Sequence, residues 1–184
     1  MMPHQLNWQE ICQMIPKRKA DAQKGDFGRL LCITGSRNMP GACLLSTQAA
    51  LRGGAGLVTV ATAPENPMRL AAAAPEAMWL PLETDEAGFL RSSDQNRKTL
   101  EKQLSRANAV LLGCGLGVTE ETRRLVHWVL EQAVCPVVLD ADGLNCAVSC
   151  IELSRRTGKD WILTPHPGEM ARLTGHSIPQ IQEN

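Results

Sequence analysis

The chain has 184 residues, of which 43% are hydrophobic and 21% are charged, and its 19 Lys and Arg residues balance 19 Asp and Glu residues. The zero net charge argues against a nucleic-acid binder that works through positive charge, and the 3% of aromatic residues leaves few faces on which bases could stack. No apolar run reaches the ~18 residues that span a bilayer, and the N-terminal sequence lacks the order of a signal peptide. We therefore expect a soluble, cytoplasmic, globular protein with no nucleic-acid and no membrane partner.

The chain contains seven cysteines, which is an odd number, and none of them form a CxxC pair. Zinc sites and redox motifs use closely spaced pairs, and secreted disulfide frameworks favour even counts. Several of these cysteines lie inside apolar runs, where a free thiol behaves as a small hydrophobic side chain. We expect all seven to be reduced and structural, with no metal site: Cys12, Cys32, Cys43, Cys114, Cys135, Cys146 and Cys150.

Five short apolar runs predict β-strands, and each run stops at Gly, Pro or Asp. Their apolar residues are continuous rather than alternating, which is typical of strands covered on both faces of a parallel sheet. The predicted strands are residues 30–34, 57–62, 109–112, 137–139 and 161–164.

Helical patterns lie before, between and after these strands. The clearest is 119–132, with Thr119 at the N-cap, two acids in its first turn and an apolar stripe. The polar stretch 83–106 predicts a loop followed by an exposed helix around 98–104. The alternating order predicts a doubly wound, mostly parallel α/β fold in a single domain over 1–184. The other predicted helices are 8–15, 42–52, 66–74 and 168–174.

Two glycine-rich loops follow predicted strands, at the carboxyl edge where open parallel sheets bind ligands. The turn 35–41 precedes a helix and is either an anion site or an ordinary turn. The loop 113–117 spaces its glycines as GxGxG, so it lacks the GxGxxG fingerprint of dinucleotide-binding dehydrogenases. Its three glycines still permit positive φ angles and a close approach of backbone to ligand.

Polar residues follow the last two predicted strands. Asp140 and Asp142 end a buried strand, where a carboxylate could orient a metal or a hydroxyl. The alternative is a helix cap, and we expect at least one of them to cap a helix that begins near Leu144. The flanking prolines hold His166 in extended backbone on a stiff loop, which favours contact with a ligand. Glu169 then falls in the first turn of the next helix, where a carboxylate is stabilised.

Six motifs in a fixed order carry a resemblance to a known family. They occupy residues 24–29, 35–42, 50–58, 113–117, 140–145 and 164–169. The chain resembles the ADP/ATP-dependent NAD(P)H-hydrate dehydratases, the carbohydrate-kinase-like domain of the YjeF family, over almost its whole length from about residue 16 to 175. The resemblance implies a ribokinase-like fold.

The resemblance also implies a metabolite-repair activity. Members of the family remove water from the hydrated nicotinamide ring of NADHX or NADPHX, and they consume ATP or ADP, with Mg²⁺, in doing so. It implies a homo-oligomer as well. The residues matching the family's substrate contacts are Ala42, Gly115 and His166, to which the neighbouring Gly41, Gly113, Gly117, Asp140 and Asn145 are added as candidates.

Two features depart from the family pattern. Cys114 replaces the proline usual between two glycines, and the family's Gly-Thr-Gly-Asp motif, which holds phosphates and supplies the catalytic base, does not occur in the chain. We therefore expect a chain that lacks the C-terminal third of the domain, carries mainly the substrate half, has no catalytic residue of its own and is inactive alone. An uncovered sheet edge would then promote association. A ribokinase-like small-molecule kinase and a non-catalytic nucleotide-binding module remain the alternatives.

Overall fold

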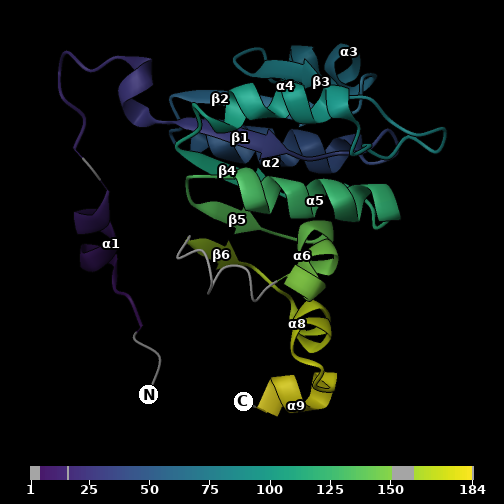
Figure 1. Cartoon of the computed structure of the whole chain (residues 1–184). Helices are drawn as coiled ribbons and strands as arrows, with labels where there is room; N and C mark the ends of the chain where they lie inside the picture. Colours follow the sequence, from purple (N-terminus) through teal and green to yellow (C-terminus); the bar gives the residue numbers. More distant parts are fainter. Residues whose placement is uncertain (1–4, 16, 151–159, 184) are drawn as a thin grey trace.

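A computed structural model describes residues 5–15, 17–150 and 160–183. Its strands form one sheet in the order β3-β2-β1-β4-β5-β6, in which every neighbouring pair is parallel (Figure 1). The predicted doubly wound parallel fold is confirmed. The strands are β1 (Arg29–Ile33), β2 (Leu57–Thr62), β3 (Met78–Pro81), β4 (Ala109–Leu112), β5 (Val137–Leu139) and β6 (Trp161–Leu163).

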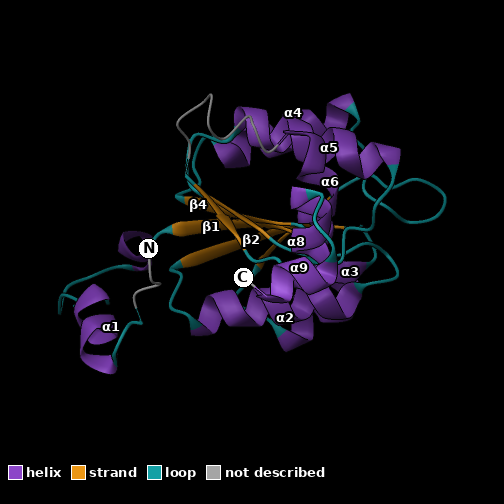
Figure 2. Ribbon diagram, turned by 90° about the horizontal axis from the view of Figure 1, so that it is seen from below, coloured by secondary structure: helices purple, strands orange, loops and turns teal. Residues whose placement is uncertain are grey.

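Helices cover both faces of the sheet. Figure 2 shows α4 and α5 on one side of the strands and α2 and α3 on the other. None of the helices in the described ranges is long and apolar enough to cross a membrane. The α-helices are α1 (Trp8–Met14), α2 (Pro40–Arg52), α3 (Asn66–Leu70), α4 (Asp94–Leu104), α5 (Glu120–Gln132), α6 (Asp142–Ala147), α8 (Pro167–Thr174) and α9 (Ile178–Glu183), and short 3₁₀ turns occupy Lys24–Phe27, Ala71–Ala73 and Val148–Cys150.

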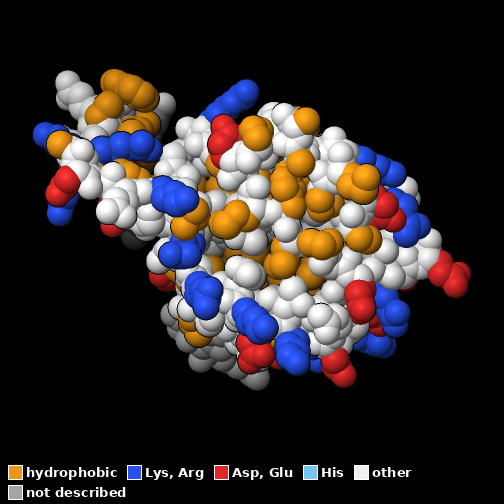
Figure 3. Space-filling model, turned by 90° about the horizontal axis from the view of Figure 1, so that it is seen from above, with side chains coloured by type: hydrophobic (Ala, Val, Ile, Leu, Met, Phe, Trp, Pro, Cys, Tyr) orange, Lys and Arg blue, Asp and Glu red, His pale blue; other side chains and the backbone are white. Residues whose placement is uncertain are grey.

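Five of the six strands occur where the sequence predicts them, but the prediction missed β3. This strand lies at an edge of the sheet, and none of its residues is buried; Met78 is 45% exposed. Its four residues, Met-Trp-Leu-Pro, are all apolar, but Pro81 lacks the N–H that a strand inside a sheet donates, so the run does not predict a strand covered on both faces. Figure 3, which views the molecule from the β3 side, shows apolar side chains in the middle of this face and charged ones along its margin.

The helix ends follow local capping. Thr119 is the N-cap of α5 as predicted, and its side chain accepts a hydrogen bond from the backbone N–H of Thr122. Helix α4 begins four residues earlier than the predicted start at Lys98, because Ser93 caps it by accepting from Asn96. All seven cysteines are free, as expected.

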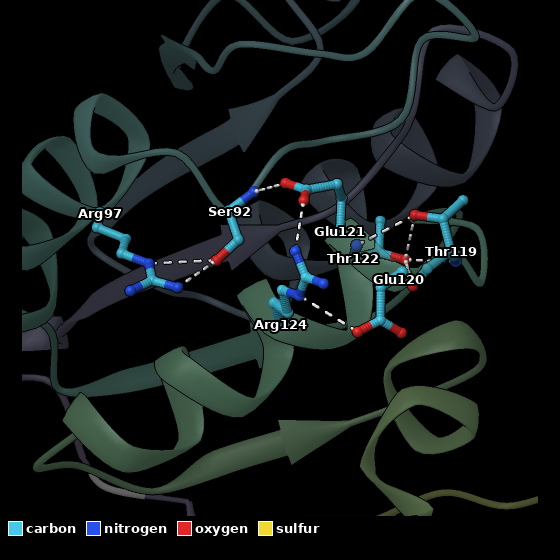
Figure 4. A network of polar contacts seen from close by, with 7 residues as sticks. All are labelled: Ser92, Arg97, Thr119, Glu120, Glu121, Thr122 and Arg124. Carbon is cyan, nitrogen blue, oxygen red and sulfur yellow. Dashed lines mark hydrogen bonds and ion pairs between the residues drawn. The ribbon is translucent and has the colours of Figure 1, made fainter.

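A polar network joins the start of α4 to the start of α5 (Figure 4). The carboxylate of Glu121 accepts from the backbone N–H of Ser92 at 2.9 Å and pairs with Arg124 at 3.2 Å. Arg97 donates to the hydroxyl of Ser92 at 2.9 Å. The connection between β3 and α4 is thereby held against α5.

The core divides between the two faces of the sheet. One cluster joins α4 and α5 to β4 and β5, and a smaller one joins α2 to β1 and β2. On the α2 face, Leu111, Val138 and Ile162 occupy paired positions on β4, β5 and β6. Leu111 and Val138 are half-buried, and Ile162 is 56% exposed. Ile162 lies on β6, which within the described residues pairs only with β5, so apolar surface is exposed at this edge of the sheet.

Candidate functional site

The candidate site lies where the strand order reverses. Starting at β1, the chain adds β2 and then β3 on one side of it. It then returns to the other side of β1, where it adds β4, β5 and β6. The loops after β1 and β4 therefore flank the switch point. These loops are joined directly. The backbone N–H of Gly35 donates to the carbonyl of Cys114 at 2.9 Å, and that of Ser36 donates to Gly115 at 2.7 Å.

Ala42 and Gly115 meet at this point. A Cβ placed on Gly115 would lie 2.7 Å from the Cβ of Ala42, and the φ of Gly115 is +69°, so this position requires glycine. Helix α2 has Met39 at its N-cap and no side-chain cap. Among the described residues, nothing accepts a hydrogen bond from the N–H groups of Gly41, Ala42 and Gly115. This arrangement favours a negatively charged ligand group.

The two outer glycines of the loop have structural contacts instead. A side chain on Gly113 would overlap the carbonyl of Asp140, and the Gly113 N–H donates to Ile33. The N–H of Gly117 donates to the carboxylate of Asp142 at 2.7 Å. Their donors are therefore already used, and of the three glycines only Gly115 has an N–H without an acceptor among the described residues.

The expectation that Asp140 or Asp142 caps the next helix is wrong. The N-cap of α6 is Ala141, at a φ of +48°, and no side chain caps the helix. Asp140 instead accepts from the hydroxyl of Thr164 at 2.8 Å and from the thiol of Cys114 at 3.3 Å. It thereby joins the loop after β5 to those after β4 and β6, because parallel strands bring these loops to one edge.

The Cys114 thiol is poorly ionised in this setting. Burial, and then the hydrogen bond and charge of Asp140, raise the pKa of Cys114 to about 11, although a contact with Ser46 opposes the shift. A thiol of this kind is protonated near neutral pH and is a weak nucleophile. Cys114 therefore contributes a hydrogen-bond donor rather than covalent chemistry.

His166 lies farther along the same edge. It follows β6, whereas β5 separates β6 from β4, so it does not share the direct contact between Ala42 and Gly115. Its backbone is extended, as predicted, with φ −71° and ψ 167°. The ring also caps α8: Nδ1 accepts from the N–H of Gly168 at 3.0 Å, and Nε2 lies 3.3 Å from the carboxylate of Glu169.

The capping role of His166 was not predicted, although an N-cap three residues before a Glu is the usual pattern of a capping box. The imidazole is 64% exposed while Glu169 is 7% exposed, so the ring remains accessible at the carboxyl edge of the sheet. Asn145 also has a structural partner, since its side-chain carbonyl accepts from Arg172 at 2.8 Å and so ties α6 to α8.

Sequence reasoning also missed a cluster of buried polar side chains below the carboxyl edge of the sheet. Asn66 donates to the hydroxyl of Thr62 at 2.8 Å, and Thr62 donates to the carbonyl of Gly35 at 2.9 Å. Thr34 and Ser36 are at most 1% exposed, and their hydroxyls have no partner among the described residues. The available signal was Thr34 and Ser36 directly after the first apolar run and Thr62 at the end of the second.

The described residues contain no group of three or more His, Cys, Asp or Glu side chains that could hold a metal ion. In nucleotide-dependent enzymes, Mg²⁺ is usually held by one or two carboxylates together with the phosphates of the substrate. The described part of the chain thus forms no metal cage of its own.

Comparison with known proteins identifies the family. A profile described as NAD(P)H-hydrate dehydratase matches residues 30–184. The chain belongs to this family. It is 39% identical over 179 residues to a bifunctional NAD(P)H-hydrate repair enzyme of Coxiella burnetii. The matched region covers 97% of the chain and 33% of that protein. It is 38% identical over 159 residues to an ADP-dependent (S)-NAD(P)H-hydrate dehydratase of Xanthomonas campestris, covering 86% of the chain and 52% of that protein.

Solved structures of family members and related proteins show the same fold. A ribokinase-like superfamily protein of Enterococcus faecalis matches with a TM-score of 0.78 at 27% identity, over 95% of this chain and 58% of its own. The ADP/ATP-dependent NAD(P)H-hydrate dehydratase of Bacillus subtilis, co-crystallised with ATP and Mg²⁺, matches with a TM-score of 0.71 at 30% identity, over 96% and 57%. The fold is therefore ribokinase-like, and the chain spans a third to somewhat more than half of these relatives.

Proposed function

We propose that this chain binds the hydrated nicotinamide nucleotide in an ADP- or ATP-dependent NAD(P)H-hydrate dehydratase. The observation that carries the proposal is the contact between Ala42 and Gly115 at the switch point, beside N–H groups that have no acceptor among the described residues. Such donors suit the phosphates of NADHX or NADPHX. Family membership favours this function over the small-molecule kinase and over the non-catalytic module.

The reaction converts a poor leaving group into a good one. The nucleotide passes a phosphoryl group to the hydroxyl oxygen of the hydrated ring, and the C–O bond then breaks so that phosphate leaves with the bonding electrons. Loss of a proton from the neighbouring carbon restores the ring double bond. Phosphoryl transfer depends on positioning and charge stabilisation, and the site residues of this chain supply the positioning of the substrate.

Ala42, Gly115 and His166 contact the substrate in this proposal. Gly41 adds a second N–H at the start of α2, whereas Gly113, Gly117, Asp140 and Asn145 hold the surrounding loops through the contacts described above. The described residues form no metal cage, so Mg²⁺ would be held mainly by the phosphates of the nucleotide and would neutralise their charge. The Gly-Thr-Gly-Asp motif does not occur among the 184 residues, so we expect substrate binding without turnover from this chain alone.

Binding of NADHX by calorimetry tests the site. Ala42→Asp places a carboxylate in the first turn of α2, where it stabilises the helix but repels phosphate. We expect affinity to fall at least about tenfold. Leu45→Asp is the matched control, because it adds the same charge on the same helix at a side chain that is 69% exposed. Equal affinities of Ala42→Asp and the wild type would contradict the proposed site.

Recovery of reduced-nicotinamide absorbance after mixing the chain with NADHX, Mg²⁺ and ATP or ADP tests activity. Binding without recovery is the expected result, and robust turnover would show that the missing motif is not needed.

We also infer a homo-oligomer in the cytoplasm whose partner is this small-molecule substrate rather than nucleic acid or membrane. The balanced charge and the apolar β6 edge support this inference. Sedimentation analysis of the purified chain tests the oligomer, and a strictly monomeric chain would contradict it.

A further inference from the structure

The connection between β3 and α4 contains a rigid loop, residues 83–91. Thr84 and Leu90 form an isolated antiparallel bridge, and Leu90 is fully buried. The N–H of Phe89 donates to the carboxylate of Asp85 at 2.9 Å, and the Asp85 N–H donates to the carbonyl of Phe89 at 2.9 Å. Asn96 of α4 bonds the backbone at both ends of the loop. The loop is thus held by contacts within itself and with α4.

The tip of this loop is bound by the loop after β1. The backbone N–H of Arg37 donates to the carbonyl of Gly88, and its guanidinium donates to the carbonyl of Glu86, both at 2.9 Å. The same guanidinium pairs with Glu65 of the loop after β2 at 2.7 Å. A side chain on Gly88 would overlap that of Arg37, so the two backbones are in close approach. Arg37 therefore holds three loops of the carboxyl edge together.

Phe89, which follows the tip, packs against the glycine-rich loop after β4. Any side chain on Gly117 would overlap the ring of Phe89. On its other side, Gly117 is held by the carboxylate of Asp142 and by the hydroxyl of Thr122, which donates to its carbonyl at 3.0 Å. Gly117 is two residues from Gly115, whose N–H faces no acceptor in the described residues. Phe89 thus limits how far this part of the loop can move.

We propose that the 83–91 loop forms a third wall of the proposed substrate site, beside the loops after β1 and β4. Arg37 and Phe89 are positioning residues in this proposal, because they fix the loops that carry Ala42 and Gly115. The loop contacts both sides of the switch point, and so adds to the backbone hydrogen bonds and the close approach of Ala42 to Gly115 that join the two site loops directly. This inference rests on the proposed function, because the wall matters only if nucleotide binds there. Neither residue needs to touch the ligand.

Hydrogen–deuterium exchange of the free chain tests the positioning role without any ligand. In Phe89→Ala, we expect the amides of residues 113–118 to exchange about tenfold faster while those of β1 and β4 remain protected. Arg37→Gln should accelerate exchange over residues 84–89. Lys102→Ala, at an exposed position near the end of α4, is the control and should change neither segment. Unchanged exchange in Phe89→Ala would overturn the proposal.

Binding of NADHX to the same variants tests the link to function. We expect the affinity of Phe89→Ala to fall at least about fivefold and that of Phe89→Leu, which keeps an apolar contact on Gly117, to recover most of this loss. Faster exchange with unchanged affinity would overturn the role as a wall of the site. A wild-type chain that binds no NADHX contradicts the proposed function instead, and the exchange data still decide whether Phe89 fixes the glycine loop.

Discussion

The contact between Ala42 and Gly115 can be tested by a double-mutant cycle. Gly115→Ala puts a side chain at a φ of +69°, which costs about 1–2 kcal/mol. The new Cβ also lies 2.7 Å from the Cβ of Ala42, and this overlap costs about 1–3 kcal/mol. We expect the free energy of unfolding to fall by about 2–5 kcal/mol, the sum of these two costs.

Two further variants separate the two costs. Gly175 has a φ of +75° with nothing within 4 Å of a Cβ, so Gly175→Ala measures the backbone cost alone. Ala42→Gly removes the overlapping atom and by itself costs about 0.5–1 kcal/mol. Combined with Gly115→Ala it should recover about 1–3 kcal/mol relative to the sum of the single variants. Urea unfolding followed by circular dichroism measures each value, and strict additivity of the two changes would refute the contact.

Three further predictions concern the cap of α5, the thiol of Cys114 and the β6 edge of the sheet. Thr119→Ala should lower the free energy of unfolding by about 1 kcal/mol in urea, and Thr119→Ser should not, because only the first change removes the oxygen that caps α5. At pH 8, iodoacetamide should modify Cys114 about a hundredfold more slowly than a thiol with the ordinary pKa of 9.0, since only the thiolate reacts and the pKa here is about 11. The rate of Cys114 modification should rise about tenfold per pH unit below its pKa, and Asp140→Asn should increase the rate at fixed pH. Equal rates in Asp140→Asn and the wild type, measured by mass spectrometry, would contradict the contact between Cys114 and Asp140. Ile162→Lys, at a side chain that is 56% exposed on β6, should shift the sedimentation profile toward monomer, and an unchanged profile would exclude β6 from self-association.

The sequence placed most of the elements because local patterns of burial and capping decide them. The runs at 57–62, 109–112 and 137–139 become strands with those bounds, since their continuous apolar residues pack into the core between sheet and helices. The cap at Thr119 and the extended backbone at His166 likewise follow from residues close by in the chain. The β3 strand was missed because its apolar run, Met78–Pro81, contains a proline, which is tolerated in an edge strand but argues against a buried one.

By itself, the sequence determined the parallel α/β layers and the family, because apolar periodicity and ordered motifs are properties of short segments. Only the tertiary structure decided which loops touch. Strand order brings Gly115 against Ala42, turns Asp140 from a helix cap into a link to Thr164, and sets Phe89 on Gly117. Contacts between segments far apart in the chain depend on how the strands are ordered across the sheet, and no local pattern of residues records that order.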